Sequence, residues 1–278
     1  MIPQKFVYLN DRFIEEATAS ILVSDLAVQR GYGIFDFFKT LGGRPIFLQD
    51  HLERFYHSAA MMHLKIKQTP VELEDILKAL LEKNQIPDSG VKIILTGGYS
   101  PDGYTQAEYP NLIITQTPLN LSLSFNHEGM SLVTYSYQRQ LAAMKTLDYS
   151  MAIWLQPFIR ENHADDVLYH SEGLVKEIPR ANFFIVTKDQ EVITAKTNVL
   201  SGVIRKNILN LENTGLKITV RDFTLAELEN AAEAFITSTT KHILPVLKID
   251  GKPVGDGKAG KISEQLYDLL LQLLPLPA

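Results

Sequence analysis

Strand-like and helix-like hydrophobic patterns alternate along the whole chain. Apolar residues alternate with polar ones in residues 6–9 and 34–38, as in half-buried strands, and recur at helical spacing in residues 52–62 and 73–81. Further strand candidates are residues 91–95, 112–115, 132–135, 167–169, 183–186, 192–194, 218–220 and 235–237. This mixture of short strands and helices predicts an α/β fold of the mixed α+β kind.

Turn and capping residues mark where these segments begin and end. The pairs Gly42-Gly43 and Asp250-Gly251 predict hairpin turns, with the first hairpin returning through residues 46–48. Helix starts are predicted at the capping box of Asp50 and Glu53, at Thr69 with Glu72, after Asp148, around Gly202, at Thr224 with Glu227, and at Ser263.

The length suits two domains with separate cores. The chain has 278 residues, 45% of them apolar, which is enough for one large domain or two smaller ones. A linker is placed near Pro118 to His127. We therefore expect an N-terminal α/β domain over residues 1–118, a linker over 119–127 and a larger C-terminal α/β domain over 128–278.

Composition disfavours several classes of function. The chain contains no Cys, which removes disulfides, thiolate metal sites and thiol nucleophiles. With 27 basic and 32 acidic residues the formal net charge is -5, which gives no general field for holding a nucleic acid. The apolar stretches are too short to span a bilayer, so we expect no membrane partner and a cytoplasmic protein.

Two motifs are interpreted as structural. Residues 255–261 have the spacing of a nucleotide-binding P-loop, but Ile262 stands where a magnesium-binding hydroxyl is needed, so a glycine-rich turn is predicted instead. His51, His57 and His63 recur every six residues and so point around a helix. They are predicted to be surface or packing residues, and no metal site is expected.

Six separated segments together resemble the class-IV, or fold-type IV, aminotransferases. They are residues 31–36, residues 51–54 with 58–59, residues 145–149, residues 172–177 with 182–184, residues 202–205, and residues 237–240 leading to 243–246. The family contains branched-chain and D-amino-acid aminotransferases and aminodeoxychorismate lyase. The resemblance implies two α/β domains with pyridoxal 5'-phosphate between them, the cofactor lysine in the larger domain, and a homodimer.

The resemblance also implies roles around the cofactor ring. Lys145 would hold the cofactor as a Schiff base and then carry the proton of the substrate, since a lysine amine suits both tasks. Glu177 would face the pyridine nitrogen and keep it protonated. Tyr149 would donate to the phenolic oxygen, and Leu200 would pack beneath the ring.

The cofactor phosphate would be bound by side chains and by main-chain amides. The resemblance implies Arg54, the amides of Val203 and Ile204, and the hydroxyls of Ser238 and Thr239. A helix start offers unpaired N–H groups and a favourable dipole, so Ile204 can stand where the family usually has threonine.

The substrate loop matches no subtype of the family. Ser100-Pro101 is followed by Asp102 and Tyr104, where D-amino-acid aminotransferases have an arginine and a histidine. Residues 95–98 lack the arginine of branched-chain enzymes. Aromatic side chains around the substrate favour a hydrophobic amino acid, and either of two arginines could bind its carboxylate. The substrate candidates are Phe35, Phe37, Tyr32, Tyr104 and Thr240, with Arg139 and Arg180 as the arginines.

The predicted function is transamination between a hydrophobic, branched-chain-like amino acid and its 2-oxo acid. A second candidate is an aminodeoxychorismate lyase that releases pyruvate and 4-aminobenzoate, because the substrate loop contains Gly-Tyr-Ser and Gly-Tyr-Thr pieces. A D-amino-acid aminotransferase and a silent binding protein are also open. The silent protein would have no reason to keep Lys145 together with Glu177.

Overall fold

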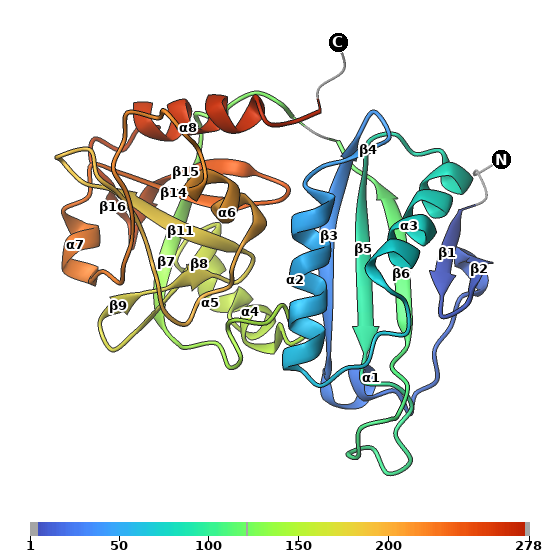
Figure 1. Cartoon of the computed structure of the whole chain (residues 1–278). Helices are drawn as coiled ribbons and strands as arrows, with labels where there is room; N and C mark the ends of the chain where they lie inside the picture. The colour runs from blue at the N-terminus through green and yellow to red at the C-terminus, as the bar shows by residue number, and fades with distance from the viewer. Residues whose placement is uncertain (1–4, 121, 276–278) are drawn as a thin grey trace. The chain divides into compact units, whose positions relative to one another are not determined.

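The computed structural model describes residues 5–120 and 122–275, which form two compact units (Figure 1). Of these residues, the first unit contains 5–120, 144–148 and 275, and the second contains 122–143 and 149–274. Each unit combines one sheet with several helices. The predicted mixed α/β fold is therefore confirmed.

The first unit is built on an antiparallel sheet of six strands in the order β2-β1-β6-β5-β3-β4. Its strands are β1 (Phe6–Leu9), β2 (Arg12–Glu15), β3 (Gly33–Leu41), β4 (Arg44–Pro45), β5 (Ser89–Thr96) and β6 (Leu112–Pro118). Helices α2 (Leu48–Met61) and α3 (Pro70–Asn84) cover one face of it, as Figure 1 shows. The short elements η1 (Glu16–Thr18) and α1 (Leu26–Arg30) connect β2 to β3.

A short segment from the middle of the chain, Met144–Asp148, adds to the edge of this sheet. Ile34 of β3 forms an antiparallel bridge with Thr146, and Leu147 donates its main-chain N–H to the carbonyl of Gly33 at 3.0 Å. A side chain at Gly33 would collide with Leu147. Lys145 was expected in the second domain, whereas its contacts place it in the first unit.

The second unit is built on ten strands. Eight of them follow the order β13-β12-β11-β14-β15-β7-β8-β9, while β10 pairs with β11 and β16 with β15. The strands are β7 (Met130–Ser136), β8 (Asp166–Ser171), β9 (Leu174–Val175), β10 (Glu177–Ile178), β11 (Ala181–Val186), β12 (Val192–Thr194), β13 (Ile218–Val220), β14 (Glu233–Ser238), β15 (His242–Ile249) and β16 (Lys252–Pro253). The helices are α4 (Ser150–Trp154), α5 (Gln156–Glu161), α6 (Val203–Leu209), α7 (Leu225–Glu229) and α8 (Lys261–Leu271).

Four of the six predicted helix starts are confirmed, since α4 begins at Ser150, after Asp148, and α6 begins at Val203, directly after Gly202, while the starts at Thr69 and Thr224 have the predicted capping boxes. Thr69 and Thr224 each accept the N–H of the glutamate three residues later, while that glutamate accepts the threonine N–H in return. Both predicted hairpin turns also form, since β3 pairs with β4 and β15 pairs with β16. No described helix combines the length and the apolar character needed to span a bilayer.

Two other helix starts were wrong. Helix α2 begins at Leu48 because the chain already turns at Phe47, whose φ is 52°, so Asp50 lies inside the first turn and residues 46–48 are not a strand. Helix α8 begins at Lys261, before the expected Ser263. The carboxylate of Glu233 caps α8 by accepting the N–H groups of its second and third residues at 3.0 and 2.9 Å.

Candidate active site

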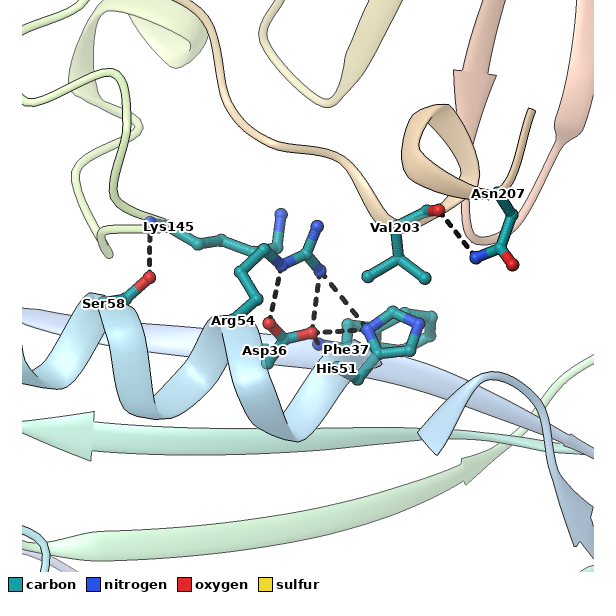
Figure 2. Close-up of polar contacts among 8 residues, drawn as sticks. All are labelled: Asp36, Phe37, His51, Arg54, Ser58, Lys145, Val203 and Asn207. Carbon is teal, nitrogen blue, oxygen red and sulfur yellow. Dashed lines mark hydrogen bonds and ion pairs between the residues drawn. The ribbon is translucent and has the colours of Figure 1, made fainter. Parts of the chain in front are cut away.

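Lys145 is fixed by its main chain to both β3 and α2. Its N–H donates to Oγ of Ser58 at 3.3 Å, and its carbonyl accepts the N–H of Phe35 at 2.9 Å. The side chain is half-buried, and Nζ lies 4.5 Å from the centroid of the Phe35 ring. Figure 2 shows this lysine with Ser58 and Arg54 of α2. The first unit thus brings together the two basic residues that the family resemblance selected.

Arg54 is held by a buried carboxylate on β3 (Figure 2). Its Nε and Nη2 donate to Oδ2 and Oδ1 of Asp36, both at 2.8 Å. Burial would raise the pKa of Asp36, but the Arg54 guanidinium and the hydrogen bond from His51 outweigh it and hold that pKa well below its usual range. Asp36 therefore stays charged and fixes the plane of the guanidinium.

His51 completes this cluster, and its role was missed from the sequence. Nδ1 of His51 lies 2.7 Å from Oδ1 of Asp36, and the ring is buried. Burial lowers the pKa of His51 below its usual value, so the ring is neutral at neutral pH. A histidine and an arginine one helical turn apart are a weak signal, because the carboxylate that joins them is on a separate strand.

A second ammonium group lies against Phe35. Nζ of Lys92 is 4.8 Å from the centroid of that ring. Lys92 stands opposite Phe37 across β3 and β5, so its side chain is on the same face of the sheet as Phe35 and Phe37. Within residues 5–120 and 122–275, the ammonium group of Lys92 forms no hydrogen bond and no ion pair. This lysine was missed from the sequence because its neighbours depend on strand register.

The two tyrosines expected near the substrate have different surroundings. The hydroxyl of Tyr32 donates to the carbonyl of Met62 at 2.6 Å, which ties β3 to the end of α2. Burial raises the pKa of Tyr32. The side chain of Tyr104 is 84% exposed on the loop between β5 and β6, where its N–H donates to Oδ1 of Asp102 at 2.9 Å.

Glu177 is a buried carboxylate with three donors around it in the second unit. Nη1 of Arg139 lies 2.5 Å from Oε1, while the side chain of Asn182 and the N–H of Leu200 donate to Oε2 at 3.1 and 3.0 Å. These contacts fix the orientation of the carboxylate. Arg139 was expected as a receptor for the substrate carboxylate, whereas the structure pairs it with Glu177.

Asn182 also positions the chain that leads into α6. Its side chain donates to the carbonyl of Leu200 at 2.8 Å, and a Cβ on Gly202 would collide with its Oδ1. Helix α6 then begins at Val203, and its N-cap residue, Gly202, has no side chain that could cap it. The N–H groups of its first turn, including those of Val203 and Ile204, therefore lack partners within the helix.

The remaining phosphate and substrate candidates lie in the second unit. Ser238 ends β14, and its Oγ accepts the N–H of Lys241 at 3.2 Å, so that Thr239 and Thr240 form the turn into β15. Arg180 is 75% exposed, with Nη2 3.4 Å from Oδ2 of Asp166. Each of the two candidate arginines, Arg139 and Arg180, therefore already contacts a carboxylate in the structure.

Tyr149 is half-buried and directly precedes the first residue of α4. By its contacts it belongs to the second unit, although it lies only four residues after Lys145. Among the described residues, no group of three or more His, Cys, Asp or Glu side chains could hold a metal ion.

Known proteins resemble this chain along nearly its whole length. D-alanine aminotransferase of Bacillus licheniformis is 29% identical over 270 residues, covering 95% of each protein. A putative branched-chain-amino-acid aminotransferase of Methanocaldococcus jannaschii is 27% identical over 273 residues, covering 94% of each. The structure of the branched-chain aminotransferase of Thermoproteus uzoniensis with norvaline matches with a TM-score of 0.87 at 21% identity, covering 97% of this chain and 94% of the other.

The sequence model of the family described as amino-transferase class IV matches residues 33–249, which include Lys145, Glu177 and most other candidate site residues. Enzymes of this family transfer amino groups with pyridoxal 5'-phosphate, as the sequence resemblance implied. The chain therefore belongs to the class IV aminotransferase family.

Proposed function

We propose that this aminotransferase binds pyridoxal 5'-phosphate through Lys145, Arg54 and Glu177. The observation that carries the proposal is the half-buried amine of Lys145, fixed through its main chain to β3 and α2 in the same unit as the Arg54 guanidinium. The three side chains match the chemistry of the cofactor, because an amine reacts with its aldehyde, a guanidinium binds its phosphate and a carboxylate pairs with its ring nitrogen.

When bound, pyridoxal 5'-phosphate supplies an aldehyde that accepts the amino group and a ring that withdraws electrons from the α-carbon of the substrate. Lys145 then moves the proton at that α-carbon. Glu177 holds the proton of the ring nitrogen, and its contacts with Arg139, Asn182 and Leu200 keep the carboxylate in one orientation.

Other residues of the second unit orient the cofactor in this proposal. Tyr149 donates a hydrogen bond to the phenolic oxygen, and Leu200 packs against the ring. For the phosphate, the N–H groups of Val203 and Ile204 at the start of α6 act with the hydroxyls of Ser238 and Thr239. The glycine at the N-cap of α6 supports this assignment, because it offers no side chain to the first amides, which lack partners within the helix.

We propose a hydrophobic amino acid as the substrate. Phe35 and Phe37 offer half-buried aromatic surface on the side of the sheet where Lys145 and Lys92 contact Phe35. Lys92 is the better candidate for the substrate carboxylate, because Arg139 and Arg180 already lie against Glu177 and Asp166. The named relatives are aminotransferases of both D-alanine and branched-chain amino acids, which favours amino transfer over the lyase reaction.

The proposal is tested first at Lys145. The purified protein with pyridoxal 5'-phosphate is expected to show visible absorption that borohydride reduction fixes covalently, and Lys145→Ala is expected to lose this fixation. Lys78→Ala, a change at an exposed lysine on α3, serves as the control. A wild-type protein that stays colourless with added cofactor would defeat the assignment.

A panel of L- and D-amino acids identifies the substrate. We expect hydrophobic members to convert the bound cofactor to its pyridoxamine form, and the enantiomer that does so decides between the two kinds of relative. Release of pyruvate from aminodeoxychorismate without an amino acceptor would instead indicate the lyase. A homodimer and a cytoplasmic location remain predictions, and the former is checked by sedimentation.

A further inference from the structure

We propose that His51 is a positioning residue, which through Asp36 holds Arg54 in the orientation that binds the cofactor phosphate. This inference rests on the proposed role of Arg54. It deepens that role by naming the residues that prepare the arginine before the cofactor arrives.

Arg54 can meet a phosphate with only part of its guanidinium. The group is planar, and the edge formed by Nε and Nη2 is occupied by the two contacts with Asp36 at 2.8 Å. Phosphate recognition is left to the edge formed by Nη1 and Nη2. The direction of that edge is set by the plane of the Asp36 carboxylate, because a two-point contact transmits orientation as well as charge.

His51 restricts the carboxylate in turn. Oδ1 of Asp36 is approached by Nδ1 of His51 at 2.7 Å, by Nη2 of Arg54 at 2.8 Å and by the N–H of Phe37 at 2.7 Å (Figure 2). Phe37 follows Asp36 directly in the chain, so its N–H moves with the same strand. The imidazole on α2 is therefore the neighbour that fixes Asp36 and Arg54 relative to each other from the helix.

The two ring nitrogens of His51 have different surroundings. A neutral ring that donates from Nδ1 to a carboxylate carries no proton on Nε2. Nε2 is buried and has no partner among the described residues, which costs stability. An apolar side chain would avoid this cost. The contact with Asp36 is what the imidazole provides and an apolar side chain would not.

The neutral charge of His51 makes it the informative position for a test. Removing Asp36 would loosen the orientation of Arg54 and would also remove the negative charge that offsets the guanidinium, and these two effects on phosphate binding oppose each other. Replacing His51 leaves the Asp36 carboxylate and its charge in place and removes the contacts of Nδ1 with Oδ1 of Asp36 and with Nη2 of Arg54, which are 2.7 and 3.3 Å long. The matched control is His57, an exposed histidine on the same helix.

The experiment compares two aldehydes that differ in the phosphate. The full chain is freed of cofactor by dialysis and titrated with pyridoxal 5'-phosphate and with pyridoxal. The dissociation constant of pyridoxal divided by that of pyridoxal 5'-phosphate reports the contribution of the phosphate. We expect His51→Leu to lower this ratio about tenfold, the weight of one hydrogen bond to a charged group. We expect His51→Gln, which keeps an N–H donor, to restore part of it, and His57→Leu to leave it unchanged.

The Arg54→Gln variant tests the proposed phosphate contact, and the His51→Leu variant tests the positioning role of His51. Arg54→Gln is expected to abolish most of the preference for the phosphate; if it does not, the role of Arg54 fails and the inference fails with it. If Arg54→Gln acts as expected but His51→Leu keeps the wild-type ratio, the inference alone is overturned. Equal losses for both aldehydes, together with a lower thermal midpoint, would show a merely structural role and would also overturn it.

Discussion

Lys39 provides a test of how burial of a charge controls the stability of this fold. It lies on β3 with 1% of its surface exposed, opposite Gly90 of β5, and the ring of Phe37 occupies the space beside that glycine. Burial lowers the pKa of Lys39 from 10.5 to about 7. The perturbation is Lys39→Met, which keeps a long flexible side chain and removes the charge.

The sign of the effect follows from the two pKa values. Below about pH 7 both states are protonated, so the cost of burying the ammonium group is present in the folded protein throughout this range. Between about pH 7 and 10.5 the folded state releases this proton while the unfolded state keeps it, so wild-type stability rises with pH. The difference of 10.5 − 7 = 3.5 sets an upper limit of about 5 kcal/mol.

Urea unfolding at a series of pH values measures this effect. At neutral pH we expect Lys39→Met to be more stable than wild type by about 1–4 kcal/mol, the range found when buried charges are replaced by apolar groups of similar volume. This advantage should shrink as the pH approaches about 10, because the wild-type lysine becomes neutral. Lys78→Met, at an exposed position on α3, should match wild type throughout.

Two results would refute this reasoning about Lys39. The first is a Met variant that is less stable than wild type at neutral pH, since this would mean that the ammonium group contributes more than its burial costs. The second is a stability difference that stays constant across the alkaline range, since the lysine would then keep its proton in the folded state.

Two further predictions concern the proposed chemistry. Glu177→Gln should lower kcat far more than it raises the dissociation constant of the cofactor, because the amide keeps the shape of the buried carboxylate but not its charge; equal losses in a paired titration and rate assay would argue for a scaffold role. If Lys92 binds a substrate carboxylate as proposed, Lys92→Met should lower kcat/KM about 10- to 100-fold for substrates that have this carboxylate, relative to analogues that lack it. The ratio of kcat/KM for norvaline to that for butylamine reports binding of the α-carboxylate, and the ratio for glutamate to that for norvaline reports binding of the distal carboxylate. Lys83→Met removes a similar contact, 4.2 Å from the centroid of the Phe6 ring, and should change neither ratio. If Lys92→Met also leaves both ratios unchanged, the lysine does not bind the substrate.

Local sequence patterns predicted the parts of the fold that depend on local interactions. Thr69 and Thr224 were identified because a capping box needs only residues three apart. The expected box at Asp50 failed because a turn at Phe47 had already started the helix. The start of α8 was missed because its capping carboxylate, Glu233, comes from β14, far earlier in the chain.

The candidate site also has residues that the sequence identified and contacts that it did not. Resemblance to a family supplied Lys145 and Glu177, but not the groups that hold them. Asp36 reaches Arg54 from a different element, and the register of β3 with β5 is needed to bring Lys92 to Phe35. Such pairings depend on distant parts of the chain, which a pattern within a single segment does not contain.

The segment that carries Lys145 along the edge of the first sheet has a consequence for dissecting the protein. Residues 144–148 add to a sheet whose strands all precede residue 119, so the order of the first unit's parts along the chain differs from their order in space. A fragment ended at the linker would lack Lys145 and would leave the N–H of Phe35 and the carbonyl of Gly33 without their partners. Circular permutation or split-protein complementation must therefore return this pentapeptide to its place before the sheet is complete and the proposed role of Lys145 can be tested.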